Sequence, residues 1–160
     1  MTVRLAEVSD APAVASVHVQ TWQSAYRGLV PDSVLDELSV QERESMWERG
    51  IPRGGVWVGL VDDAVAGFCA VGPSSEPDAA FQLYALYVLP SAWGTPLGYE
   101  LARAALGAEQ DMVLWVFDEN PRARRFYERL GFRADGTVKT ETIGGAELKE
   151  IRYRLTGVAG

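Results

Sequence analysis

The chain has 160 residues, of which 48% are hydrophobic, and a formal net charge of -7 from 15 basic and 22 acidic side chains. This length fits one domain that buries its own core, so a single domain over residues 1–160 is expected. The acidic balance argues against a general nucleic-acid-binding protein, because such a protein needs a basic face to neutralise phosphates.

The expected compartment is the cytoplasm. Cys69 is the only cysteine, so no disulfide forms within the chain, as is usual in a reducing compartment. Residues 1–7 lack the apolar run of a signal peptide, and no apolar stretch approaches the length of a membrane span, so no membrane partner is expected. The negative charge is compatible with a cationic substrate such as an amine, although acidic proteins are often simply soluble for this reason.

The N-terminal part is predicted to be a short strand followed by a helix. Residues 3–8 alternate well enough for a strand, and Ser9 and Asp10 offer an N-cap for the helix. One face of that helix carries Val14, Val17, Thr21 and Ala25. His18, the only histidine, lies in the same helix, where a packing or surface role is favoured over metal binding or catalysis because no second histidine can assist it.

Two aromatic residues of this helix are candidates for a binding site. Trp22 and Tyr26 are four residues apart and therefore share a helix face. They either belong to the core or wall a pocket, and the sequence leaves both interpretations open.

The middle of the chain changes from helices to strands. The segment Gly28–Pro31 breaks the first helix, and residues 32–38 and 39–49 are predicted as two short helices. Residues 56–61 and 64–71 have strand character and are joined through two aspartates, which predicts a hairpin.

The centre of the chain is a strand followed closely by a helix. Residues 81–90 are β-branched, aromatic and apolar and end in a proline, which predicts a buried strand. Residues 93–102 contain glycines four apart and then apolar residues at helical spacing, and the helix is expected to end near Gly107. A turn of this kind aims free N–H groups and the helix dipole at one point and so favours an anion such as a phosphate. An ordinary strand–turn–helix connection is the alternative.

The C-terminal part repeats the alternation of strand and helix. Residues 112–117 form a continuous apolar run of strand length, and Asn120 is a good N-cap for a helix that Gly131 closes. Residues 133–142 and 147–155 are predicted as a final hairpin. The order of elements predicts an α/β fold in which a mixed sheet carries helices on both faces.

Taken together, these segments resemble the GNAT superfamily of acyl-CoA-dependent N-acyltransferases over nearly the whole chain. The most specific similarity is a helix block with the pattern Asn120-x-x-Ala123-x-x-Phe126-Tyr127-x-x-x-Gly131-Phe132. The strand that ends at Pro90, with the turn behind it, resembles the superfamily's other motif, and residues 21–31 are similar to the helical region of a bacterial branch. The resemblance implies a mostly antiparallel central sheet with a splayed parallel strand pair.

The resemblance also implies which residues hold acetyl-CoA as co-substrate. The backbone of Leu86 and Val88, with Tyr87 between them, would pair with the pantetheine arm where the strands splay. The turn would hold the pyrophosphate through Trp93, Gly94, Thr95, Leu97 and Gly98. Asn120 and Ala123 would line the thioester.

Tyr127 is the implied general acid. A tyrosine with an ordinary pKa near 10 is protonated at neutral pH and can donate a proton to the leaving thiolate. The oxyanion formed when an amine attacks the thioester needs N–H donors, which a splayed strand edge supplies. Tyr127 also lies on the apolar face of its helix, so a purely structural role is the alternative.

Two positions depart from the family pattern. Related sequences usually have Arg or Gln followed by alternating glycines in the turn, whereas here the turn contains Pro96, which lacks an N–H. Losing a hydrogen bond to a charged group costs about 1.5–3 kcal/mol, or roughly 10- to 150-fold in affinity. Thr95 as N-cap and Pro96 in the first turn still predict a sound helix start. Gln82 stands where a glutamate is often the base that deprotonates the amine. The alternatives are a base elsewhere in the chain that acts through water, which the sequence does not identify, or an amine of low pKa that needs no base.

A group of arginines begins at Arg122 and includes Arg124. Its members are Arg122, Arg124, Arg125, Arg129 and Arg133. In an acidic protein they form a local positive patch suited to the phosphates of CoA, and Arg124 is the member assigned to the cofactor. A solvated helix face is the alternative.

The predicted function is transfer of an acetyl group from acetyl-CoA to an amine of a small molecule or peptide. Trp22, Tyr26 and Tyr84 are the candidate acceptor residues, because aromatic rings can hold a cation, and no metal is expected. The rivals are a non-catalytic acyl-CoA-binding domain, suggested by Pro96 and Gln82, and an interaction protein on the same scaffold that has lost CoA. A homodimer is compatible with the sequence but not indicated by it.

Overall fold

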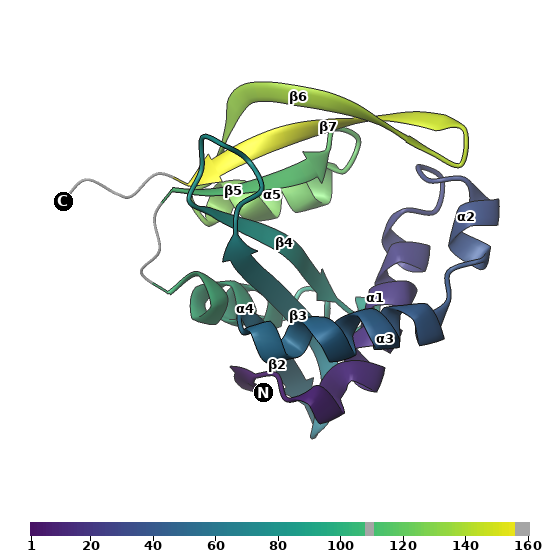
Figure 1. Ribbon diagram of the computed structural model, residues 1–160, viewed down its shortest axis with the longest axis vertical. Helices are drawn as coiled ribbons and strands as arrows, with labels where there is room; N and C mark the ends of the chain where they lie inside the picture. The colour runs from purple at the N-terminus through teal and green to yellow at the C-terminus, as the bar shows by residue number, and fades with distance from the viewer. Residues whose placement is uncertain (108–110, 156–160) are drawn as a thin grey trace.

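The computed structural model describes residues 1–107 and 111–155, which form one seven-stranded sheet with helices on both faces (Figure 1). The strand order is β1-β2-β3-β4-β5-β7-β6, and every neighbouring pair is antiparallel except β4 and β5. The strands are β1 (Thr2–Leu5), β2 (Val56–Val61), β3 (Ala64–Pro73), β4 (Phe81–Val88), β5 (Met112–Phe117), β6 (Arg133–Ile143) and β7 (Ala146–Leu155). The helices are α1 (Ala11–Ala25), α2 (Asp32–Asp36), α3 (Val40–Gly50), α4 (Leu97–Leu106) and α5 (Pro121–Arg129). The predicted fold class and element order are confirmed.

The parallel pair is joined over a short distance only. β4 and β5 pair through Phe81 with Met112 and Gln82 with Val113, although β4 continues to Val88 and β5 to Phe117. The outer ends of these strands therefore separate, and their backbone edges are not joined by a ladder there. This V-shaped gap in the middle of the sheet is the predicted splay.

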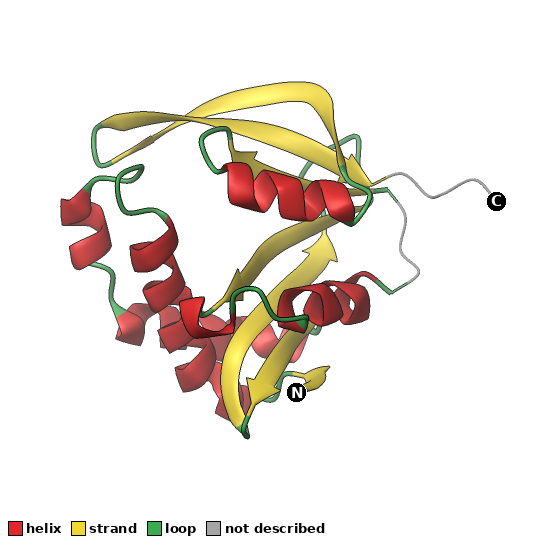
Figure 2. Cartoon of the chain, turned by 180° about the vertical axis from the view of Figure 1, so that it is seen from behind, coloured by secondary structure: helices red, strands yellow, loops and turns green. Residues whose placement is uncertain are grey.

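Helices α4 and α5 cover one face of the sheet (Figure 2), and α1 and α3 cover the other. The core beneath α4 depends on a close approach to β2. A Cβ built on Gly59 would lie 2.6 Å from Leu97 Cδ1, so only glycine lets this helix lie so near the strand. The other face buries Val14, Val58 and Phe68. Within the described residues, no helix is both long and apolar enough to cross a membrane.

Several element ends differ from the prediction. Asp10 is the N-cap residue of α1, as predicted, but its carboxylate makes no capping bond because it accepts hydrogen bonds from Arg4 and from the Glu7 N–H, and Ser9 lies in the 3₁₀ turn Val8–Asp10. β4 ends at Val88, and Pro90 begins another 3₁₀ turn. α4 begins at Leu97, so its N-cap residue is Pro96 instead of Thr95. The first hairpin turns as predicted at Asp62 and Asp63, which both have positive φ.

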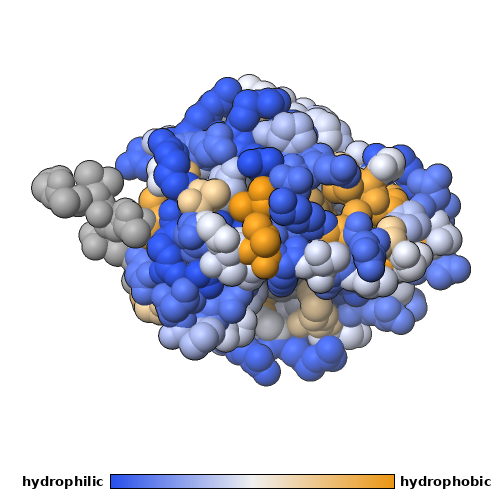
Figure 3. Space-filling view, turned by 90° about the horizontal axis from the view of Figure 1, so that it is seen from above, coloured by the Kyte–Doolittle hydropathy of each residue, from blue (hydrophilic) through white to orange (hydrophobic). Residues whose placement is uncertain are grey.

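The long β6–β7 hairpin reaches across to α2 (Figure 1). Its turn contains Gly144 with φ 57°, and a Cβ there would lie 2.3 Å from Cγ2 of Val34. Leu148 of the hairpin is buried in one cluster with Leu35 of α2 and Phe117 of β5. Side-chain packing therefore joins the C-terminal hairpin to the N-terminal helices. Figure 3, which views the molecule from the side of this hairpin, shows a mainly hydrophilic face with separate apolar areas.

Candidate active site

A cavity of about 800 Å³ lies where β4 and β5 separate. Strand β5 lines it with side chains from both of its faces, because successive side chains of a strand point to opposite sides. Leu114 and Val116 belong to the core beneath α5, whereas Phe117 packs with α2 on the other side. The cavity therefore extends through the gap, and two molecules can approach one another from opposite faces of the sheet.

The structure brings together most of the residues predicted to bind the cofactor, although the ring of Tyr87 packs on the α1 face against His18. Those that line the cavity are Leu86, Tyr87, Val88, Trp93, Gly94, Thr95, Gly98, Asn120 and Ala123. They come from the free end of β4, from the turn before α4 and from the start of α5. Segments that are separate in sequence thus form one continuous wall.

Trp93 organises the turn before α4. Its indole N–H donates to the carbonyl of Val88 over 2.8 Å, and the guanidinium of Arg122 lies 3.4 Å from the centre of its ring. A carbonyl oxygen has two lone pairs, so Val88 keeps one for another donor. The stacking brings the positive charge of Arg122 from α5 to the turn before α4, and both residues line the cavity.

The first turn of α4 presents backbone donors beside this charge. The first N–H···O bond of the helix runs from Glu100 to Pro96 over 2.9 Å. The N–H groups of Leu97, Gly98 and Tyr99 precede it and are the ones that a helix start leaves without intrahelical acceptors. The Leu97 N–H donates to the hydroxyl of Thr95 over 3.4 Å, and that hydroxyl donates to the carbonyl of Ala92 over 2.6 Å. Positive charge and N–H groups at a helix start suit a bound phosphate.

Helix α5 places Tyr127 at the centre of the cavity wall. The Asn120 side chain accepts a hydrogen bond from the Ala123 N–H over 3.3 Å, and Pro121 begins the helix, as predicted. The Tyr127 ring is 9% exposed and packs edge to face on Phe126 and Phe132. Burial, reinforced by Cys69 and Tyr87, raises the pKa of Tyr127 well above its ordinary value. The phenol therefore stays protonated at neutral pH and can donate a proton into the cavity.

An aromatic wall stands on the opposite face. Trp22 and Tyr26 meet edge to face with ring centres 4.9 Å apart, and Tyr26 meets Phe117 in the same way at 5.0 Å. All three line the cavity, so Trp22 and Tyr26 serve both as packing and as wall. Tyr84 also lines it but is 49% exposed, with its hydroxyl donating to the Pro73 carbonyl.

His18 packs behind this wall, as predicted. Its Nδ1 accepts a hydrogen bond from the indole of Trp47 over 3.2 Å, and its ring stacks on Tyr87 at 5.4 Å. Burial, helped by the charge of Arg43, lowers the pKa of His18 to about 4, so the imidazole is neutral at physiological pH. Within the described residues, no three histidine, cysteine or acidic side chains gather where they could hold a metal ion.

Three charged residues of the C-terminal hairpin complete the cavity, and sequence reasoning did not single them out. Glu150 of β7 and Lys139 and Glu141 of β6 all line it. Glu150 pairs across the sheet with Phe117 on one side and Lys139 on the other. In the sequence these three residues are only scattered charges within the predicted strands, which are also typical of a solvent-exposed face.

Comparison with known proteins identifies the family. A sequence model described as "Acetyltransferase (GNAT) family" matches residues 19–132, which is more than half of the chain. The chain belongs to this family. The resemblance found from the sequence is thereby confirmed, and so is the predicted enzyme class of acyltransferase.

Two curated relatives and two solved structures extend the likeness over the full chain. "Probable N-acetyltransferase Rv2775" of Mycobacterium tuberculosis is 29% identical over 96% of this chain and 92% of its own. "Uncharacterized N-acetyltransferase YuaI" of Bacillus subtilis is 29% identical over 94% and 90%. The PaiA N-acetyltransferase of Thermoplasma acidophilum, solved with coenzyme A, superposes with a TM-score of 0.76 at 17% identity and covers 96% and 98%. The yncA protein of Salmonella typhimurium, solved with acetyl-CoA, gives 0.74 at 18% and covers 100% and 95%.

In this GNAT protein, two of the residues predicted to bind the cofactor do not line the cavity. The side chain of Leu97 is fully buried in the core beneath α4, which leaves only its backbone near the turn. Arg124 donates to Asp118 and to the hydroxyl of Tyr153 on the side of α5 away from the cavity. Arg122 and Arg129 line the cavity instead. A helix turns by about 100° per residue, so the positions in an arginine run face different ways.

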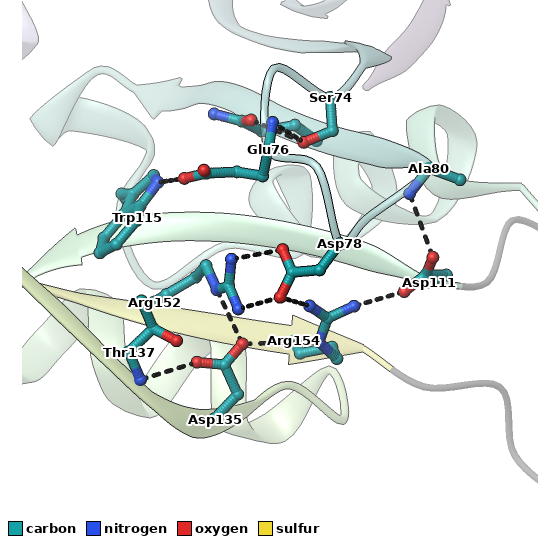
Figure 4. Close-up of polar contacts among 11 residues, drawn as sticks. Ser74, Glu76, Asp78, Ala80, Asp111, Trp115, Asp135, Thr137, Arg152 and Arg154 are labelled. Carbon is teal, nitrogen blue, oxygen red and sulfur yellow. Dashed lines mark hydrogen bonds and ion pairs between the residues drawn. The ribbon is translucent and has the colours of Figure 1, made fainter.

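Gln82 has a structural role in this GNAT chain. Its Oε1 accepts a hydrogen bond from the Ser74 hydroxyl over 3.1 Å, and that hydroxyl accepts from the Glu76 N–H (Figure 4). Glu76 in turn accepts from the indole of Trp115 over 2.7 Å. The side chain that replaces the familiar glutamate therefore fixes the loop of residues 74–80 over β5.

The far end of this loop is fixed by charge. Asp78 forms a bidentate pair with Arg152 at 2.7 and 2.8 Å, and Arg152 also donates to Asp135 over 2.7 Å (Figure 4). Arg154 contacts Asp78 and Asp111 beside them. These ion pairs connect the β3–β4 loop to β7 and β6 toward the end where β4 and β5 are still paired, rather than at the open end of the splay beside Glu150.

Proposed function

We propose that this GNAT protein transfers the acetyl group of acetyl-CoA to a primary amine of a small molecule or peptide. The observation that carries the proposal is the cavity through the splay, with helix-start donors on one face, an aromatic wall on the other and Tyr127 between them. The complexes of related proteins with coenzyme A and acetyl-CoA support the choice of co-substrate. The single cysteine, Cys69, is buried and reduced, which supports a cytoplasmic location.

In the proposed reaction, the amine enters past Trp22 and Tyr26 and attacks the thioester carbonyl from the face opposite the cofactor. Free N–H groups of the splayed β4 edge stabilise the oxyanion. When the C–S bond breaks, Tyr127 donates its proton to the thiolate. The helix start and Arg122 hold the pyrophosphate, and backbone groups of Leu86 and Val88 hold the pantetheine arm.

The test is release of free CoA thiol from acetyl-CoA, measured with a panel of primary amines for the natural protein and for Tyr127→Phe. We expect kcat to fall about 100-fold or more in the variant, because a general acid contributes that much, while affinity for acetyl-CoA barely changes. An unchanged kcat would remove Tyr127 from the mechanism.

A non-catalytic acyl-CoA-binding role is the second candidate, because Pro96 occupies the N-cap of α4 and has no N–H to offer. Tight binding of acetyl-CoA without transfer to any amine of the panel would favour this role over the enzyme.

A further inference from the structure

The carboxylate of Glu150 is unusual among the charged groups of the described chain. Its side chain is 12% exposed, and its buried Oε2 atom makes no hydrogen bond within the described residues but forms an ion pair with Lys139 Nζ at 3.6 Å. Burying a carboxylate without a hydrogen bond is costly, and most buried polar groups in native proteins have a hydrogen-bond partner. Glu150 also lines the cavity, so its carboxyl group lies beside the space that a bound molecule would occupy.

The position of Glu150 connects it to the reacting centre. Glu150 pairs with Phe117, the last residue of β5, and so lies beside the open end of the splay. Tyr26 and Tyr87 are close enough for the charge of Glu150 to raise the pKa of both phenols, and Tyr127 does the same to Tyr26. Glu150 and Tyr127 thus both lie near Tyr26 in the lining of the same cavity.

We infer that Glu150 is the base that takes the proton from the acceptor ammonium. This inference rests on the proposed acetyl transfer and supplies the group that Gln82 cannot provide, since an amide has no basic oxygen at neutral pH and that of Gln82 is bonded to Ser74. It defines the acceptor as an amine that enters in its cationic form. The cation donates to the Glu150 carboxylate and packs against the rings of Trp22 and Tyr26.

Every proton that moves in the proposed reaction has a donor and an acceptor among the groups named. The Glu150 carboxylate takes one proton from R–NH₃⁺ and later releases it to solvent. The neutral amine nitrogen forms the C–N bond, and the carbonyl electrons move to oxygen. The C–S bond then breaks, Tyr127 gives its proton to sulfur, and the remaining extra proton on nitrogen restores the phenol. The products are the N-acetyl amide, CoA thiol and one proton.

The groups around Glu150 bring its pKa close to neutral pH. The titratable and charged groups that face it are Tyr26 of α1, Tyr87 of β4, Lys139 and Glu141 of β6, and Arg152 of its own strand. Burial, with Glu141 next in effect, raises the pKa of Glu150 to about 7. Lys139 opposes this shift from 3.6 Å, beyond hydrogen-bond length, while lying over the ring of Trp115. Arg152 is already paired with Asp78 and Asp135.

The first experiment uses two probe amines, benzylamine, which is protonated at neutral pH, and phenylhydrazine, which is not. In Glu150→Gln we expect kcat/KM for benzylamine to fall about 100-fold or more, with phenylhydrazine transfer little changed because it needs no base. An equal loss with both probes would indicate a merely structural role and overturn the inference.

Matched variants of the two neighbours sharpen the test. In the natural protein, kcat/KM should rise with pH through about 7 as Glu150 loses its proton. Glu141→Gln should move this rise in kcat/KM to lower pH, because a like charge is removed, and Lys139→Met should move it to higher pH. If the rise moves in neither variant, it reports the titration of a group other than Glu150.

A ¹³C NMR titration of the glutamate carboxyls measures the pKa of Glu150 directly, with its signal assigned by comparison with Glu150→Gln. This test does not depend on turnover of either probe amine. Titration of Glu150 near pH 7 supports the inference, and titration in the ordinary glutamate range contradicts it. Calorimetry with acetyl-CoA separates the two proposals. If the natural protein does not bind acetyl-CoA, the proposed function is wrong. If it binds acetyl-CoA but Glu150 has an ordinary pKa, only the role of Glu150 as base is wrong.

Discussion

The two sides of the cavity are built in different ways. The cofactor side consists mostly of backbone: the free edge of β4, the turn through Gly94 and the first turns of α4 and α5. The acceptor side consists of side chains from α1, β5, β6 and β7, among them Trp22, Phe117 and Glu150. A backbone site depends on where helices and strands begin and end. A side-chain site depends on which distant segments pack together, so a substitution on one side should leave the other nearly intact.

The largest structural effect is expected at Arg152, which fixes the loop of residues 74–80 on the acceptor side. Its side chain is 7% exposed and its partner Asp135 is 15% exposed. Arg152→Ala removes the hydrogen bonds to Asp78 and Asp135 and leaves Asp135 only the longer ion pair with Arg154 at 3.5 Å, so we expect a loss of about 3 kcal/mol in the free energy of unfolding, measured by urea denaturation.

The control for Arg152 is Arg27→Ala, which removes two ion pairs to exposed aspartates and should change the free energy of unfolding much less. The pairs also link stability to pH. Arg152 helps hold the pKa of Asp78 and of Asp135 below the ordinary range. Their contribution is complete above the pKa of an unfolded aspartate and is lost as the pH falls through the lower folded values. Arg152→Ala should therefore flatten the acid end of the stability curve, and an unchanged curve would contradict this assignment.

A smaller effect is expected at Gly144, where the hairpin meets α2. Gly144→Ala places a Cβ against Val34 at a positive φ, so we expect about 2 kcal/mol of destabilisation and a raised KM for the acceptor amine. Gly145→Ala is the matched control, because φ is also positive there but no atom lies within 4 Å of the new Cβ. Acetyl-CoA affinity should be the same in both variants. A loss confined to acetyl-CoA binding would show that the two sides are not independent.

The smallest effect is expected on the cofactor side at Arg122. Arg122→Ala removes the cation stacked on Trp93 and should weaken acetyl-CoA binding by about tenfold, more at low salt than at high salt. Arg124→Ala is the control, since its guanidinium is bonded to Asp118 and Tyr153 outside the cavity. If Arg124→Ala weakened binding more than Arg122→Ala, the assignment of the phosphate contact would be reversed.

These two sides also show what the sequence could predict. The cofactor side could be predicted from the sequence because its segments carry local signals: an apolar strand that ends in proline, glycines in a turn, and an Asn-Pro helix start. Leu97 and Arg124 were placed less well, because the rotation of a side chain about a helix depends on where that helix begins. Glu150 was missed for another reason. Its burial follows from the pairing of β7 with β5 and from the packing of α1 over them, which no local pattern records.

The most direct test of the whole account is calorimetric titration of acetyl-CoA into the natural protein, with Pro96→Ala measured beside it. We expect the natural protein to bind one acetyl-CoA per chain. The variant should bind somewhat more tightly, because it regains one N–H at the start of α4. Absence of binding by both proteins would contradict the account, since a cavity that does not admit acetyl-CoA through the splay cannot support acetyl transfer.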